Sequence, residues 1–326
     1  MGARRRTARA PGVAAVAATA AVCVAVGVAP ARGQISDRQV EGQAGVYRAK
    51  SPVDLAEKLH AGFQGTIVVP AGVDWRMVTP CGGYDELGRC FDPPMMKIPL
   101  KSGVTLVGER DRLGRRPVLR AASSQLSYSL FETDASSLVR IEGLHLIGPK
   151  KFKNRFKKEP KTGGIFVRED ATTIPSLGSA QPPRVVIRDN EIEHFSNAVS
   201  VSSPILANTP EDYDKESRVR PTSEDAGLVR VEGNYLHDNL ASGAGYGVVL
   251  GGGAYAHIEG NVFEYQNHHI AASGYAYSGF IARFNYSLRG TYKNHAGEWP
   301  HTFDVHGRGA RQRRSTRAAP PAPTSR

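Results

Sequence analysis

The sequence predicts an all-β chain that folds as a parallel β-solenoid. The first observation is a phrase that occurs four times, an apolar residue followed three positions later by Asn: Ile187–Asn190, Val231–Asn234, Ile258–Asn261 and Ala282–Asn285. The second is the spacing of the four Asn residues, 44, 27 and 24 positions, which is the size of one coil in a repeat protein. The third is that the segments are short, rich in Val and Ile, and alternate with period two, which favours strands over helices.

The first 31 residues are expected to be an export signal. Four Arg residues precede an apolar stretch from Val13 to Val28, and Ala29-Pro-Ala31 supplies the small residues of a cleavage site. The apolar stretch is shorter than the roughly 20 residues of a membrane-spanning helix. The sequence therefore predicts a secreted, extracellular protein with no stable membrane anchor, in which 32–50 form an N-terminal linker.

Export determines how the three cysteines are interpreted. Cys23 is removed with the signal, whereas Cys81 and Cys90 remain in one loop of the mature chain. In an oxidising compartment such a pair is expected to form a local disulfide.

The formal net charge of +11 comes from the two ends of the chain. Residues 1–31 carry four Arg and 308–326 carry six, with no acidic residue in either segment. Without those ten, 32 basic residues face 31 acidic ones, so nothing favours a nucleic-acid partner. We expect the tail 308–326 to be disordered. Because a solenoid needs a cap over its last coil, we also expect a chain truncated relative to a longer β-helix.

The elements begin with a short helix over 51–60, in which Ser51 is the N-cap, Pro52 is the first helical residue, and Leu55 and Leu59 share one face. Strands follow within 65–72, 98–108 and 117–120. This order, with Thr66-Ile-Val-Val-Pro-Ala-Gly72 and Ser102-Gly-Val-Thr-Leu-Val-Gly108, resembles the opening of the pectate-lyase-like superfamily. The resemblance covers about 50–307. It implies a right-handed parallel β-helix over 51–307 whose N-terminal helix caps the first coil.

The later coils can be aligned with one another. Residues 139–147 form an earlier coil with Leu144 at the Asn position, and second strands are expected within 198–202, 247–251, 269–273 and 302–306. The alignment stacks two inward columns of a continuous core: Val199, Val248, Ile270 and Phe303, and Val201, Leu250, Ala272 and Val305. The basic segment 149–161 and the polar segment 203–227 are predicted surface loops. The four Asn residues are expected to form a structural ladder of stacked amides.

The main candidate site lies in the last coils, where six of the ten His residues fall between His257 and His306. Outward positions there predict one patch of His269, Asp304 and His306, with His268 and His301 at its edge. A His oriented by a carboxylate can act as a general base, and the same side chains can hold a divalent metal. A solvated polar face without function is the alternative.

Other side chains complete this candidate site. The resemblance implies that Arg283 neutralises a uronate carboxylate, and an ion pair with Glu259 is the alternative. Aromatic residues near this region are expected to stack on sugar rings: Tyr246, Tyr275, Tyr277 and Trp299. The basic segment 150–161 could steer a polyanion toward them.

A second candidate site follows the Asn positions, where Glu193, His237 and Glu264 align in one column. His237, Asp238 and Glu264 are candidate ligands for Ca²⁺ or another divalent metal. Hydrogen bonds that only stabilise the turns are the alternative.

Taken together, the residues and the resemblance predict a secreted enzyme that cleaves an acidic polysaccharide by β-elimination. His306 or His269 would remove the proton, Asp304 would orient that His, and Arg283 or a metal ion would neutralise the uronate. The alternatives are a non-catalytic cell-surface protein that binds glycan, a truncated and inactive relative of such an enzyme, and metal-assisted hydrolysis at the His cluster. The expected partner is an acidic polysaccharide or cell-envelope glycan, and a monomer is expected.

Overall fold

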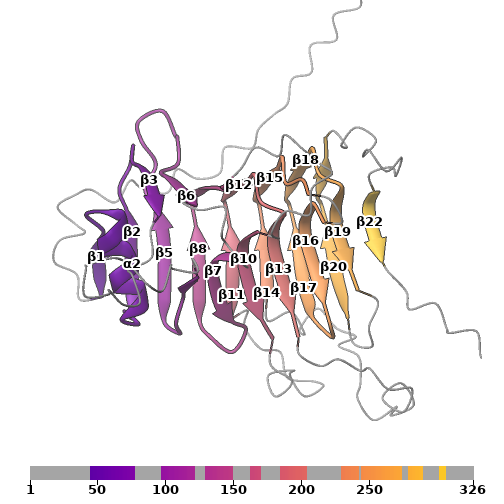
Figure 1. Cartoon of the computed structure of the whole chain (residues 1–326), viewed down its shortest axis with the longest axis horizontal. Helices are drawn as coiled ribbons and strands as arrows, with labels where there is room; N and C mark the ends of the chain where they lie inside the picture. The colour runs from indigo at the N-terminus through magenta and orange to yellow at the C-terminus, as the bar shows by residue number, and fades with distance from the viewer. Residues whose placement is uncertain are drawn as a thin grey trace, which may run out of the picture. The chain divides into compact units, whose positions relative to one another are not determined.

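A parallel β-helix is formed by the residues that the computed structural model describes (Figure 1). These residues are 45–77, 97–121, 129–149, 162–169, 184–203, 229–241, 244–273, 278–288 and 301–305. The expected signal 1–31, the Cys81–Cys90 pair, the basic segment 150–161 and the tail 308–326 lie outside them.

The strands build three sheets, which we number in the order in which each coil visits them. Sheet 1 contains β1 (Val46–Arg48), β2 (Gly65–Val69), β5 (Val104–Gly108), β8 (Val139–Glu142), β11 (Val185–Arg188), β14 (Val229–Glu232), β17 (Tyr255–Glu259) and β20 (Gly279–Arg283). Sheet 2 contains β3 (Asp74–Met77), β6 (Val118–Ala121), β9 (His145–Ile147), β12 (Glu191–Glu193), β15 (Tyr235–His237), β18 (Val262–Glu264) and β21 (Tyr286–Ser287). Sheet 3 contains β4 (Ile98–Pro99), β7 (Ser129–Asp134), β10 (Gly163–Arg168), β13 (Asn197–Ser202), β16 (Tyr246–Gly251), β19 (His268–Ala272) and β22 (His301–Val305).

Each strand pairs in parallel with the equivalent strand of the next coil, so the colours of Figure 1 run in chain order from β1 to β22. Strand β1 lies within 32–50, the segment expected to be a linker, and pairs with β2. The sequence alignment of the later coils is confirmed, because Val199 pairs with Val248, Val248 with Ile270, and Ile270 with Phe303.

The expected N-terminal helix is present as α2 (Pro52–His60). The Ser51 hydroxyl accepts a hydrogen bond from the Asp54 amide at 3.1 Å, as an N-cap does. Leu55 and Leu59 are buried, and the helix packs against β3 and β4. Within the described residues, no helix has both the length and the apolar character needed to cross a membrane.

Inward side chains fill the space between the three sheets. Sheet 3 contributes the fully buried side chains of Val199, Val201, Val248 and Leu250. Sheet 1 contributes that of Ile187, which is also fully buried. Burial of such side chains contributes about 1.5–3 kcal/mol each, so the stacked columns are the main source of stability.

A ladder of buried Asn side chains joins the coils at the bend between sheets 1 and 2. The Asn190 amide N–H donates to Asn234 Oδ1, the Asn234 N–H to Asn261 Oδ1, and the Asn261 N–H to Asn285 Oδ1, each at 3.0 Å. The Asn234 Nδ2 also donates to the Ile187 carbonyl at 2.9 Å. The predicted structural role of these residues is therefore confirmed.

The residue before each ladder position has a left-handed backbone. This column has φ of +74° at Gly143, 55° at Asp189, 60° at Gly233, 63° at Gly260 and 54° at Phe284. Glycine adopts this conformation without steric cost, whereas a bulky side chain such as that of Phe284 does not.

At the start of the sheet 3 strands, the side chains do not alternate regularly between the inner and the outer face. The register aligns Gly164, Ala198, Gly247 and His269 in one column. A Cβ on Gly164 would meet the Phe195 side chain, and one on Gly247 would meet the Phe263 side chain, so this column faces inward. The next residue on each strand faces inward too, as Ala198 and Val199 show with full burial. Two consecutive inward residues mark a local bend.

A carboxyl group is buried directly after β10. Glu169 is 5% exposed, and its carboxylate accepts a hydrogen bond from the Tyr255 amide at 3.1 Å. Burial raises the pKa of Glu169 to about 8 despite that bond.

Replacing Asn234 with Ala is expected to lower the free energy of unfolding by roughly 3 kcal/mol. The Asn190 N–H and the Ile187 carbonyl lose their partner, and each buried polar group left unpaired costs about 1–3 kcal/mol. Urea denaturation measures the change. Asn197→Ala is the control, because among the described residues the Asn197 side chain makes a single long hydrogen bond, to Ser200 at 3.4 Å. Equal losses in the two variants would contradict a ladder that stabilises the fold.

Replacing Glu169 with Gln is expected to remove a loss of stability at alkaline pH. The Glu169 carboxyl has a pKa near 4.5 in the unfolded chain and about 8 in the folded one. Its contribution to the free energy of unfolding is therefore full below pH 4.5 and is lost as the pH rises through 8. At about 1.4 kcal/mol per pKa unit, that loss is about 5 kcal/mol. Thermal midpoints of both proteins at pH 5 and 9 measure it, and parallel decreases in the two proteins would count against the raised pKa.

Candidate functional site

Polar side chains on the outward face of sheet 2 contact one another along a repeated diagonal. The first residue of one strand contacts the third residue of the equivalent strand in the next coil. The contacts are Asp74 to Arg120 at 2.7 Å, His145 to Glu193 at 3.0 Å, Glu191 to His237 at 3.3 Å, and Tyr235 to Glu264 at 2.6 Å. The equivalent positions on β6 and β9 hold the apolar residues Val118 and Ile147.

The central two diagonals bring two Glu and two His side chains into one network. His145 Nε2 lies 3.0 Å from Glu193 Oε1 and 3.5 Å from Glu191 Oε1, while His237 Nε2 lies 3.3 Å from Glu191 Oε1. The other ring nitrogen of His237 is 2.9 Å from Asp238 Oδ2. The side chain of His237 is only 11% exposed, so these interactions are little screened by water.

The network shifts the pKa values of its members in opposite directions. The hydrogen bond from His237 lowers the pKa of Glu191, and the positive charges of His145 and Arg116 add to that effect. Burial alone would raise the pKa of Glu193, but the bond from His145 and the charge of His194 outweigh it and lower that pKa. Burial alone would lower the pKa of His237, but hydrogen bonds to Glu191 and Asp238 outweigh it and raise that pKa. Ionised carboxylates and protonated His237 therefore stabilise one another.

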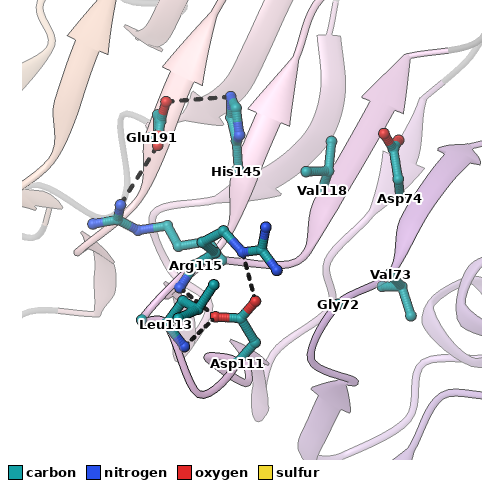
Figure 2. A pocket seen from close by; sticks show the side chains of 11 residues that line it. Gly72, Val73, Asp74, Asp111, Leu113, Arg115, Val118, His145 and Glu191 are labelled. Carbon is teal, nitrogen blue, oxygen red and sulfur yellow. Dashed lines mark hydrogen bonds and ion pairs between the residues drawn. The ribbon is translucent and has the colours of Figure 1, made fainter.

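One end of the network opens into a pocket of about 500 Å³ (Figure 2). Its wall includes His145, Glu191, Asp74 and the turn that carries Arg115 and Arg116. Figure 2 shows His145 and Glu191 joined on one side of the pocket and Arg115 beside Asp111 below them.

The two arginines of the pocket are held differently. Arg116 is 18% exposed and lies 2.9 Å from Asp189 and 3.6 Å from Glu191. Arg115 is 72% exposed and pairs with Asp111 of its own turn at 2.6 Å. Water competes for an exposed pair of this kind and weakens it, so Arg115 can exchange Asp111 for another anion.

The patch predicted in the last coils is found in part. His268 Nδ1 lies 3.2 Å from Asp304 Oδ2, and the His268 and His301 rings lie 5.3 Å apart. His268 and His301, which were expected at the edge, are therefore the residues beside Asp304. His306 lies outside the described residues.

The expectation that His269 faces outward beside Asp304 is wrong. His269 is 2% exposed, its ring stacks on Phe263 at 5.4 Å, and its Nδ1 lies 2.9 Å from the Ser287 hydroxyl. The physical reason is the bend at the start of the sheet 3 strands, which turns this column inward. Burial, with a smaller effect from the charge of His268, lowers the pKa of His269 to about 4. The buried ring is therefore neutral at pH 7.

Of the remaining candidates of this first site, one lies on another sheet, one contacts His268, and three are not described. Arg283 is exposed on β20, where Glu259 of β17 is its register partner. Tyr246 packs on His268 with ring centroids 5.1 Å apart. Tyr275, Tyr277 and Trp299 lie outside the described residues.

The second candidate set differs by one residue from the expected metal ligands. His237 and Asp238 lie together. The third residue with a ligand atom within 4.8 Å of theirs is Glu193, in place of the expected Glu264. Glu264 instead accepts the hydrogen bond from the Tyr235 hydroxyl, which raises the Tyr235 pKa together with burial.

His145, Glu191, Arg115 and Arg116 were not among the site residues predicted from the sequence. His145 and Glu191 follow positions 144 and 190 of the ladder column, so the repeat alignment already placed them on one outward face. The turn at 111–116 carries no repeat signal, and its position beside β9 and β12 follows only from the folded chain.

The fold and this site together define a parallel β-helix protein with a polar network and a pocket on one outward sheet face. Comparison of the chain with family models, with curated proteins and with solved structures finds no match in any of the three.

Replacing Glu191 with Gln is expected to lower the pKa of His237. The carboxamide carries no charge to stabilise the imidazolium, so burial prevails. An NMR titration of the His237 ring protons measures the pKa. Glu132→Gln is the control, since Glu132 pairs with Lys97 and Arg168 on another sheet. An unchanged His237 pKa in Glu191→Gln would show that the network does not act electrostatically.

Proposed function

We propose that the protein is a secreted carbohydrate-active β-helix protein of the pectate-lyase-like superfamily that cleaves an acidic, uronate-containing polysaccharide by β-elimination. The observation that carries the proposal is that an exposed guanidinium and an imidazole held by carboxylates line the same pocket. The resemblance of 50–108 to the opening of that superfamily, and the parallel β-helix itself, support the assignment.

β-Elimination at a uronate has two requirements. The substrate carboxylate must be neutralised so that the neighbouring C5 proton becomes acidic, and a base must then remove that proton. Arg115 has the charge and exposure for the first role, because a guanidinium binds a carboxylate through two parallel hydrogen bonds. Arg116, fixed by Asp189 and Glu191, adds a second guanidinium to a wall that also carries the carboxylates of Asp74, Asp111 and Glu191.

His145 has the position for the second role. It lines the pocket with a side chain that is 19% exposed, and Glu193 orients its ring through the 3.0 Å contact. An imidazole held by a carboxylate is a usable general base. His269 is buried, and its pKa is lowered to about 4, so it is a less accessible and weaker base. The base is therefore assigned to sheet 2 rather than to the last coils.

A non-catalytic glycan-binding protein is the second candidate. It is favoured by aromatic side chains on the last described coil, where Phe284 is 78% exposed and Tyr286 is 68% exposed. Such rings can stack on sugars without any chemistry.

Incubation with a panel of acidic polysaccharides is expected to produce unsaturated uronides, which are detected by their ultraviolet absorbance. His145→Gln is expected to lower kcat by about 100-fold or more, as loss of a general base does. Arg115→Ala is expected to lower kcat/KM by about tenfold or more, because the charge-assisted contact both binds the uronate and neutralises its carboxylate for proton removal. Arg112→Ala is the control, since Arg112 is exposed in the same turn but does not line the pocket.

Two results would contradict the proposed chemistry. Full activity of His145→Gln would remove His145 from the reaction. Binding of a polysaccharide by the folded protein without any unsaturated product would favour the glycan-binding function instead.

A further inference from the structure

We propose that His268, His301 and Asp304 form a binding site for a divalent transition metal of the zinc class. These residues lie on β19 and β22, away from the sheet 2 pocket in the fold, and the proposed lyase chemistry does not use them. The three side chains each offer one ligand atom, and these atoms lie within 4.8 Å of one another.

The strand register brings the three residues together. His268 pairs with His301, and Ala271 pairs with Asp304, on neighbouring strands of sheet 3. In a regular strand, residues three apart face opposite sides. The bend that turns His269 inward removes this alternation, so positions 301 and 304 share the outer face. Ala271, the register partner of Asp304, has only a methyl side chain, and the His268 ring reaches the Asp304 carboxylate on the next strand.

The spacing of the donors fits a metal of this size. Zinc binds nitrogen and oxygen ligands at about 2.0–2.1 Å, which places tetrahedral ligands about 3.3 Å apart. His268 Nδ1 and Asp304 Oδ2 are already 3.2 Å apart. The exposed His301 ring, 5.3 Å from that of His268 between centroids, can supply the third ligand by a side-chain rotation.

Neighbouring groups restrain the His268 ring and the backbone of His301, and the His301 side of the site is open to solvent. The Tyr246 ring packs on His268 at 5.1 Å and limits its rotation. The His301 amide donates to the Asn267 carbonyl at 2.9 Å and fixes the start of β22. Because His301 faces solvent, further coordination positions of a bound ion are open to water or to a ligand oxygen.

The chemistry of the donors selects the class of metal. Two imidazoles and one carboxylate suit zinc, iron(II), cobalt(II) or similar ions, whereas calcium and magnesium prefer oxygen ligands only. The Glu193–His237–Asp238 group is the competing site. There His237 interacts with carboxylates through both ring nitrogens, Glu191 on one side and Asp238 on the other, and a metal would have to break that network.

The test is calorimetric titration of the chelator-treated full chain with zinc chloride, with the visible spectrum of the cobalt(II) complex as a second readout. The wild type is expected to bind one ion. His301→Asn and Asp304→Asn are each expected to weaken binding by more than about 100-fold, since loss of even an outer-shell contact weakens metal affinity by about 10–100-fold. His60→Asn, which changes an exposed His on α2, is expected to bind as the wild type does.

Three outcomes would overturn the proposal. The first is no zinc binding by the wild type, and the second is unchanged zinc affinity in His301→Asn. The third is loss of zinc binding in His237→Asn, which would place the ion in the competing group. His301 is exposed on a strand at the edge of sheet 3, so its replacement is not expected to unfold the protein. The thermal midpoint of metal-free His301→Asn verifies that this variant is folded. If its midpoint is lowered, Asp304→Asn provides an independent test.

Discussion

The hydrogen bonds between successive coils are the constraint on which the rest of the structure depends. The parallel pairing keeps equivalent residues of successive coils in register, from Gly65 beside Val104 in sheet 1 to Ala272 beside Val305 in sheet 3. A slip by one residue would move every inward side chain to the outer face. The Asn ladder opposes such a slip, because its buried amides find partners only when the four bends are aligned.

The stacking of equivalent strands determines which outward side chains meet. Residues directly in register lie side by side, and long side chains also reach the diagonal neighbour. On sheet 2 this geometry makes an ion pair of Asp74 and Arg120, and a network of carboxylate–imidazole contacts among His145, Glu191, Glu193 and His237. The backbone is the same in each coil, so the chemistry depends only on which residues occupy the diagonal.

The repeat could be predicted from the sequence because it depends on short-range patterns. The Asn at each bend and the alternation of apolar residues determined the columns of Val199 and Val201, and both columns are present. The orientation of His269 could not be predicted, because it depends on a bend that replaces the regular alternation with two inward residues. In the three preceding coils the same position holds Gly164, Ala198 and Gly247, and these small residues fit either face.

The candidate site was only partly accessible to the same reasoning. Columns of aligned residues placed His237 near Glu193, yet a column contains no information on diagonal contacts such as His145 with Glu193. The pocket was not predictable at all, since Arg115 and Asp74 are brought together by packing of a turn against a strand of another coil. Patterns of period two describe a strand, whereas a pocket requires knowledge of how separate segments are placed.

The left-handed residue before Leu144 and before each of the four ladder Asn residues has a consequence for the order in which coils open. Three of the five positions are Gly, but Phe284 holds the same conformation with a bulky side chain, at a cost of about 1–2 kcal/mol. A solenoid opens coil by coil, and the coil with the weakest local free energy opens first. Among the described coils that is β20–β22, which carries Phe284 together with the exposed Phe303 and Val305. The His268–Asp304 contact would then have a shorter lifetime than the pocket of sheet 2, so slow amide exchange would persist around His145 after it had been lost around Asp304.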